Sequence, residues 1–188
     1  MLPALQQGNA GAAGCSFQVI NDFQNGLAEG WKFTSGECQG YQVIESGDPS
    51  RGKVLKRAIQ YVWDHAPSVL YREIKPGTPG AGSQRGIRFW MKTDEPVYAE
   101  VSLMAGNERY CTSVGVGTEW QEYRVPFDRF VKPGPNGEPI TPEALEKVDR
   151  ISFMPVNDSS LFRSVLYIDD LSILEKQPST SAGTSQPK

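Results

Sequence analysis

The chain has 188 residues, a length that suits one domain of ordinary size. Hydrophobic residues make up 38% of the sequence, charged residues 22%, and the formal net charge is −3, which together exclude a disordered polyelectrolyte and a basic nucleic-acid-binding protein. No apolar run reaches the roughly 20 residues that a membrane-spanning helix needs. With 19 glycines and 14 prolines, the composition favours a globular fold that is rich in turns.

The two ends of the chain differ in composition from its middle. Residues 1–15 are mostly small or polar without hydrophobic periodicity, so we expect a disordered leader or linker there. Residues 176–188 are rich in Ser, Thr and Pro, which is typical of a flexible linker. The folded body is therefore expected over residues 16–175. Such flanks are typical of one module of a longer, secreted protein; a frayed tail on a free-standing domain is the open alternative.

The body is predicted to consist of short strands separated by turns. Runs of β-branched, aromatic and alternating residues occupy 16–20, 30–34, 41–45, 54–63, 68–74, 86–93, 97–104, 109–116, 120–127, 149–156 and 164–174. Gly, Pro, Asn and Asp cluster at several of the boundaries. A short helix is expected at 141–148, with Thr141 as its N-cap and Pro142 at its first position. Without alternating helices, the pattern predicts an all-β antiparallel sandwich or barrel.

Alternation within the strands separates core positions from surface positions. In residues 86–93, positions 87, 89 and 91 are apolar and share one face. In residues 54–63, the odd-numbered set contains Arg57, Tyr61 and Trp63, and we expect it to line an open sheet face because a buried Arg needs a partner. For the two aromatic residues, burial in the core stays open as the alternative. The other large aromatics are expected to be structural: Trp31, Phe33, Phe89, Trp120, Tyr123, Phe127, Phe153 and Tyr167.

The sequence gives little support for an active site. It contains a single histidine, His65, and three cysteines, Cys15, Cys38 and Cys111, without a CxxC pair, which argues against a zinc site. Cys38 and Cys111 either form a disulfide or remain separate thiols. No Gly-x-Ser-x-Gly element and no glycine-rich phosphate loop is present. Binding without catalysis is therefore the favoured hypothesis.

Five segments, taken in order, resemble the carbohydrate-binding modules of the galactose-binding-like jelly-roll superfamily, closest to the family 11 type. The segments are 19–26 followed by Gly30-Trp31, 50–55, 86–94, 119–130 and 167–171. The segment at 119–130 is the most specific, because it resembles a Trp-x-x-x-x-x-Pro-Phe-x-x-Phe element. The chain is also similar to the related domain of the complex I intermediate-associated protein family.

The resemblance implies a two-sheet antiparallel jelly roll with one concave face that holds a glucan chain. It also implies a structural calcium ion that joins the first strand, an early loop and the last strand. Carried over by position, its ligands would be Gln24, backbone carbonyls of the loop from Asp48 to Lys53, and Asp169, with either Asp22 or Asp170 as a further ligand. The chain departs from the family at Gln24, where a Glu is usual, and this change removes one negative charge.

Sugar rings stack on aromatic side chains while planar polar groups bind their hydroxyls. The candidate ligand-binding residues are Arg57, Tyr61, Trp63, His65, Tyr98, Glu100, Tyr110, Met154, Asn157 and Asp158. We expect a secreted, non-catalytic module that binds β-glucan and targets an appended glycoside hydrolase. The alternatives are a protein-interaction or assembly domain of the complex I intermediate-associated type and a small glycan lyase or hydrolase.

Overall fold

The structure is a computed structural model, and it describes residues 17–26, 28–33, 41–62, 69–77, 84–156 and 161–175. Strands dominate this part of the chain: β1 (Phe17–Asn21), β2 (Trp31–Phe33), β3 (Tyr41–Glu45), β4 (Lys53–Val62), β5 (Leu70–Glu73), β6 (Gln84–Thr93), β7 (Val97–Ala105), β8 (Glu108–Val116), β9 (Gln121–Pro126), β10 (Val148–Val156) and β11 (Leu161–Glu175). A 3-10 turn, η1 (Phe127–Arg129), and a short helix, α1 (Pro142–Leu145), lie between β9 and β10.

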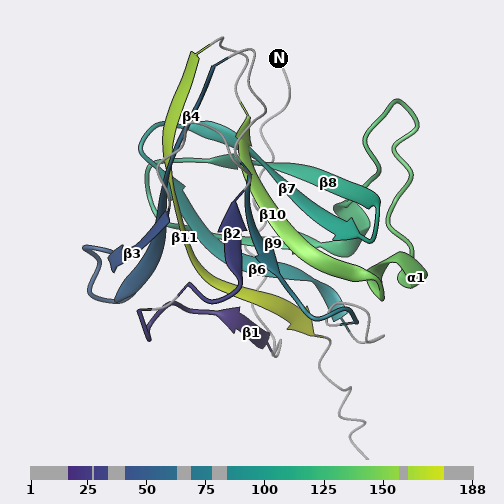
Figure 1. Cartoon of the computed structure of the whole chain (residues 1–188), viewed down its shortest axis with the longest axis horizontal. Coiled ribbons are helices and arrows are strands. Elements are labelled where there is room, and N and C mark those ends of the chain that lie inside the picture. The colour runs from purple at the N-terminus through teal and green to yellow at the C-terminus, as the bar shows by residue number, and fades with distance from the viewer. Residues whose placement is uncertain are drawn as a thin grey trace, which may run out of the picture.

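The described strands form two antiparallel sheets (Figure 1). Sheet A has the order β3-β4-β11-β6-β9, and β1 also pairs with β11. Sheet B has the order β2-β5-β10-β7-β8. Neighbouring strands run antiparallel throughout both sheets. The prediction of an all-β, two-sheet antiparallel sandwich is therefore confirmed.

The hydrophobic core lies between the two sheets. Ile87, Phe89 and Met91 on β6 are all 0% exposed, as the alternation of that segment predicts. The ring of Phe89 in sheet A meets the ring of Phe153 in sheet B edge to face, at 5.1 Å between centroids. Each such side chain contributes about 1.5–3 kcal/mol through burial, so these contacts hold the two sheets together.

Two aromatic residues depart from the expected pattern of burial. Trp120 and Tyr167 are only half-buried and contact each other at 6.4 Å between ring centroids. Tyr167 pairs in register with Lys56 on one side and Lys92 on the other, and both ammonium groups lie over its ring, at 5.8 and 5.1 Å from the centroid. Cations therefore cover these rings on the solvent side of sheet A. Most of the other expected aromatics are buried: Trp31, Phe89, Tyr123, Phe127 and Phe153. The side chain of Phe33 lies outside the described part.

The helix begins where the sequence predicts and ends earlier. The Thr141 hydroxyl accepts a hydrogen bond from the Ala144 N–H at 3.3 Å, which confirms Thr141 as the N-cap. The helix ends at Leu145 instead of residue 148. Val148 is fully buried and already belongs to β10, so tertiary packing ends the helical segment.

Strand β11 changes its partner halfway along its length. Residues 161–168 pair with β4, whereas residues 171–174 pair with β1 along the same edge. The pairing with β6 also shifts register between Asp169 and Ser172, and Asp170 has a φ of 50°, which residues other than glycine rarely adopt. This irregularity gives β11 a bend at which the loops following β1 and preceding β4 meet it (Figure 1).

Candidate functional site

The outer face of sheet B carries polar and aromatic side chains from every strand of that sheet. In β7, Ala99, Val101 and Leu103 are buried, so the alternate residues lie on the outer face. The register of the neighbouring strands then defines the rest of this face. Its principal residues are Lys32, Tyr71, Glu73, Tyr98, Glu100, Met104, Arg109, Arg150, Met154 and Val156.

Tyr98 is the most exposed large aromatic residue among those that the structure describes, at 61% of its surface. Its cross-strand partners are Gly115 on β8 and Val156 on β10. A Cβ atom on Gly115 would lie 3.9 Å from Cε1 of Tyr98. Because glycine has no side chain, the Tyr98 ring lies beside the backbone of β8. Val156 is itself 38% exposed. This end of sheet B therefore presents an exposed aromatic ring next to an exposed valine, and aromatic rings of this kind stack on the apolar faces of sugars.

Charged groups on the same face are held in place by their neighbours. The Glu100 carboxylate accepts hydrogen bonds from the Ser102 hydroxyl at 2.6 Å and from Nη1 of Arg109 at 3.2 Å. Nζ of Lys32 donates to Glu73 at 2.8 Å, and this bond lowers the pKa of the Glu73 carboxyl and raises the pKa of Lys32. Such partners reduce the freedom of side chains that would otherwise have to be ordered on binding.

An arginine and a tyrosine form a stacked pair in the middle of this face. The guanidinium carbon of Arg150 on β10 lies 4.6 Å from the ring centroid of Tyr71 on β5. The guanidinium group is planar and carries five N–H donors, so the stacked pair combines a flat surface with hydrogen-bonding capacity. The candidates predicted from the sequence do not include Tyr71, Arg150, Lys32 or Arg109.

The structure brings together three of the predicted ligand-binding residues. Tyr98 and Glu100 lie two positions apart on β7, and Met154 on β10 pairs directly with Glu100. Tyr110, by contrast, is 2% exposed and belongs to the core, and its hydroxyl donates to Glu108 at 2.8 Å. The expectation that Tyr110 contacts ligand is therefore corrected: its parity on β8 places it on the inner face of sheet B.

The remaining predicted ligand residues do not join this set. Arg57 and Tyr61 lie on β4, which belongs to sheet A, where they pair with Leu166 and Phe162. Their side chains lie outside the described part of the structure. The predicted face therefore divides between two sheets. The other candidates fall outside the described residues: Trp63, His65, Asn157 and Asp158.

Of the two cysteines that could form a disulfide, Cys38 and Cys111, only Cys111 lies among the described residues. Cys111 on β8 carries a free thiol, and burial together with the nearby Glu100 carboxylate raises its pKa. Cys38 and Cys15 lie outside the described residues. In the described part of the chain, no helix is long and apolar enough to cross a membrane.

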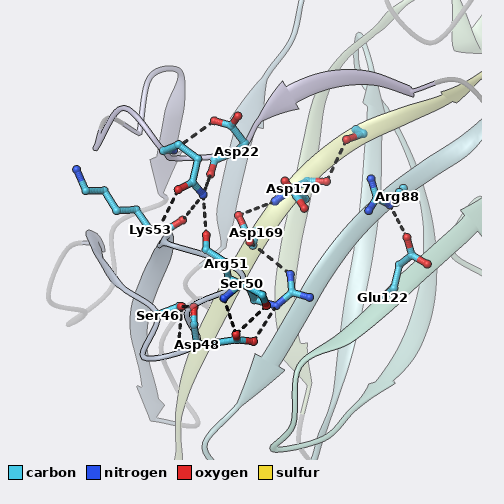
Figure 2. A network of polar contacts seen from close by, with 12 residues as sticks. Asp22, Ser46, Asp48, Ser50, Arg51, Lys53, Arg88, Glu122, Asp169 and Asp170 are labelled. Atoms are coloured by element: carbon cyan, nitrogen blue, oxygen red, sulfur yellow. Dashed lines mark hydrogen bonds and ion pairs between the residues drawn. The ribbon is translucent and has the colours of Figure 1, made fainter.

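The residues that the resemblance marks as calcium ligands do meet at one place. This place is the β1–β4–β11 junction, formed by Asp22, the loop 46–53 and Asp169 (Figure 2). Gln24 belongs to it through hydrogen bonds to Asp22 and to the loop. Nε2 of Gln24 donates hydrogen bonds to the backbone carbonyls of Asp22 at 2.8 Å, Arg51 at 2.7 Å and Lys53 at 3.2 Å. Oε1 of the same side chain accepts from the Lys53 N–H at 3.2 Å.

The carboxylates of the junction also have partners. Asp169 is 2% exposed, and its carboxylate accepts from Nη1 of Arg51 at 3.4 Å and from the Asp170 N–H at 2.9 Å. Burial raises the pKa of Asp169 to about 6, and the charge of Asp170 adds to this shift. Asp48 accepts from both the hydroxyl and the N–H of Ser50, which lower its pKa.

The donor set as it stands does not fit calcium. Calcium binds six to eight oxygens at about 2.3–2.6 Å. Here the three convergent carbonyls face an N–H donor, and Arg51 places a positive charge beside the buried Asp169 carboxylate. No group of three or more His, Cys, Asp or Glu residues that could hold a metal ion occurs among the described residues.

Comparison with solved structures shows which proteins share this fold. The family 11 carbohydrate-binding module of the cellulosomal cellulase Lic26A-Cel5E of Clostridium thermocellum matches with a TM-score of 0.64 and 14% identity, over 87% of this chain and 96% of that chain. A family 11 module from the same organism, solved with a β-1,3-1,4-mixed-linked tetrasaccharide, matches with a TM-score of 0.63 and 14% identity, over 88% and 98%.

A third structure places the same fold inside an enzyme. An exo-β-agarase matches with a TM-score of 0.62 and 13% identity, over 86% of this chain and 26% of that chain. Comparison of the sequence with protein-family models and with curated proteins finds no match. At these identities the likeness concerns the fold. It confirms the resemblance to family 11 carbohydrate-binding modules and the jelly-roll class that the five sequence segments indicate.

Proposed function

We propose that this chain is a non-catalytic polysaccharide-binding module and that the outer face of sheet B is its binding surface. The observation that carries the proposal is the exposed ring of Tyr98, placed beside Gly115 and Val156 on a sheet whose fold is that of carbohydrate-binding modules. An aromatic residue left 61% exposed on a strand is suited to a ligand with an apolar face.

In this proposal, a sugar is bound by two kinds of contact, stacking on an aromatic ring and hydrogen bonds to its hydroxyl groups. A pyranose ring laid on Tyr98 buries apolar C–H groups, at about 25 cal/mol for each Å² of apolar surface removed from water. Glu100 and Arg150 then supply an acceptor and several donors for the sugar hydroxyls along the same face. Because Ser102 and Arg109 already fix the Glu100 carboxylate, little ordering accompanies its contact with ligand.

The ligand class that we propose is β-glucan. A family 11 module with the same fold was solved with a β-1,3-1,4-mixed-linked tetrasaccharide, which supports this choice. We also propose that the module is secreted and tethers a glycoside hydrolase to its substrate. Tethering raises the local concentration of the catalytic domain at the polysaccharide without requiring new chemistry. The agarase, in which this fold corresponds to 26% of the chain, supports such an arrangement.

Native affinity electrophoresis tests the proposal. The purified chain is run through gels that contain mixed-linkage β-glucan, xyloglucan, glucomannan, xylan or hydroxyethylcellulose. We expect retardation by a β-glucan, and loss of that retardation in Tyr98→Ala. Tyr167→Ala is the matched control, because it removes a half-buried tyrosine from sheet A, and it is expected to leave the retardation unchanged.

Two outcomes would count against the proposal. Retardation by none of the polysaccharides would contradict carbohydrate binding and would favour the protein-interaction alternative. Retardation that persists in Tyr98→Ala and disappears in Tyr167→Ala would keep carbohydrate binding and reject the outer face of sheet B as the site. The folded state of both variants is first checked by thermal melting.

A further inference from the structure

The β1–β4–β11 junction joins three segments that are far apart in the sequence. The side chain of Gln24 bonds to carbonyls 27 and 29 residues away, at Arg51 and Lys53. Arg51 in turn contacts Asp169, which is 118 residues away (Figure 2). These contacts lie where β1 replaces β4 as the partner of β11. A break of this kind leaves backbone carbonyls that need an electropositive partner.

We propose that the carboxamide of Gln24 and the guanidinium of Arg51 together take the place of a cation at this junction. The three segments are then held together without a bound metal ion. Nε2 of Gln24 carries two protons and meets three carbonyl oxygens at 2.7–3.2 Å. The positive end of the amide dipole therefore lies where carbonyl oxygens converge, as a cation would. Arg51 supplies the charge that balances Asp169.

The orientation of the Gln24 amide is fixed by its surroundings. In the orientation observed, Nε2 faces acceptors only, and Oε1 faces the Lys53 N–H. Turning the amide over would place Oε1 against three carbonyl oxygens and Nε2 against an N–H donor. Only a bound cation would make that reversed orientation favourable. The amide without metal and the reversed amide with metal are thus two distinct states.

The absence of a side chain at Gly52 leaves room for the Gln24 amide. Gly52 has a φ of 60°, and a Cβ atom at this position would lie 2.3 Å from Oε1 of Gln24. Any side chain at residue 52 would therefore displace the amide. Asp22 adds a further restraint, because its Oδ1 accepts the Gln24 backbone N–H at 3.2 Å.

Arg51 is equally restrained. Its side chain is 11% exposed, and its guanidinium carbon lies 3.6 Å from the ring centroid of Trp90. It is therefore held between an aromatic face and the Asp169 carboxylate. A divalent ion that used Asp169 as a ligand would have to displace this charge from a stacked position. A junction that closes without metal does not require the chain to bind a polysaccharide.

Thermal unfolding with and without calcium tests this inference. We expect the melting temperature of the wild-type chain to be the same in EDTA and in millimolar calcium. Gln24→Glu replaces the two N–H donors by a carboxylate facing three carbonyls, so its melting temperature in EDTA is expected to fall by about 3–6 °C. Calcium is expected to restore it, because a carboxylate and carbonyl oxygens form a ligand set for that ion.

Gln42→Glu is the matched control. Gln42 is exposed on β3, and the same chemical change there is expected to leave the melting temperature unchanged in either buffer. Isothermal titration of the wild-type chain with calcium provides a readout that needs no variant, and we expect no binding.

Three results would overturn the inference. A saturable rise in the wild-type melting temperature with calcium, or stoichiometric calcium binding by the wild-type chain, would show that an ion occupies the junction. A Gln24→Glu variant as stable in EDTA as the wild type would show that the amide donors contribute nothing. Failure of calcium to restore Gln24→Glu would show that the convergent carbonyls do not form a cation site.

Discussion

Replacing Gly52 by alanine should destabilise the fold by more than its backbone conformation alone predicts. A non-glycine residue at a φ of 60° costs about 1–2 kcal/mol. The new Cβ would also lie 2.3 Å from Oε1 of Gln24 and force that side chain out of its four hydrogen bonds. Because Gln24 lies at the surface, we assign about 1–2 kcal/mol to this loss, near the lower end of the range for several hydrogen bonds.

The sum for Gly52→Ala is therefore about 2–4 kcal/mol, or a fall in melting temperature of roughly 5–15 °C for a domain of this size. Gly47→Ala is the matched control. Gly47 has a φ of 77°, and a Cβ there meets nothing within 4 Å, so this variant changes backbone conformation only. The free energy of unfolding of Gly47→Ala should fall by about 1–2 kcal/mol. Urea denaturation of both variants measures the difference.

A double-mutant cycle isolates the part that belongs to Gln24. In the Gln24→Ala background the clash disappears, and Gly52→Ala should then lose no more stability than Gly47→Ala does. If Gly52→Ala and Gly47→Ala lowered the free energy of unfolding equally in the wild-type background, the reasoning would be refuted. The close approach of residue 52 to the Gln24 amide would then make no contribution to stability.

Three further predictions concern the proposed binding face and the core. Tyr98→Ala should lower affinity for the bound polysaccharide about 10-fold or more in isothermal titration without changing the melting temperature, since the ring is largely exposed. Arg150→Ala should weaken binding while Arg124→Ala, an exposed arginine on β9 of sheet A, should not; equal effects would contradict the choice of face. Phe153→Ala should lower the free energy of unfolding by about 3–5 kcal/mol in urea, and a loss below 1 kcal/mol would contradict its place in the core.

Local periodicity is what made most of the fold predictable. The alternation at Ile87, Phe89 and Met91 is a property of one strand, and the structure buries all three. Thr141 followed by Pro142 is likewise a local signal, and the helix begins there. The end of that helix was less predictable, because Val148 belongs to β10 through contacts with residues distant in sequence.

The face that carries the proposed binding site could not be predicted from single strands. Alternation shows that Tyr110 and Tyr98 each have a definite side, but it does not show which side meets the core. Tyr110 packs inward and Tyr98 outward because β7 and β8 pair in a particular register. Tyr71 and Arg150 were missed for the same reason: they meet only when β5 pairs with β10.

The β1–β4–β11 junction illustrates the limit of a resemblance. The resemblance indicated positions that do come together, from Asp22 and Gln24 to Asp169. It did not indicate that the Gln24 amide would donate to the convergent carbonyls or that Arg51 would pair with Asp169. Those contacts depend on side-chain geometry, which sequence position alone does not specify.

The most direct test of the proposed function is an NMR titration of the isotope-labelled chain with an oligosaccharide of the β-glucan class. Chemical shifts should change at the backbone amides of Tyr98, Glu100 and Met154 and at their neighbours on β5 and β8. The amides around Tyr167 in sheet A should stay unchanged. Changes confined to sheet A, or none at saturating oligosaccharide, would contradict binding of β-glucan on the outer face of sheet B.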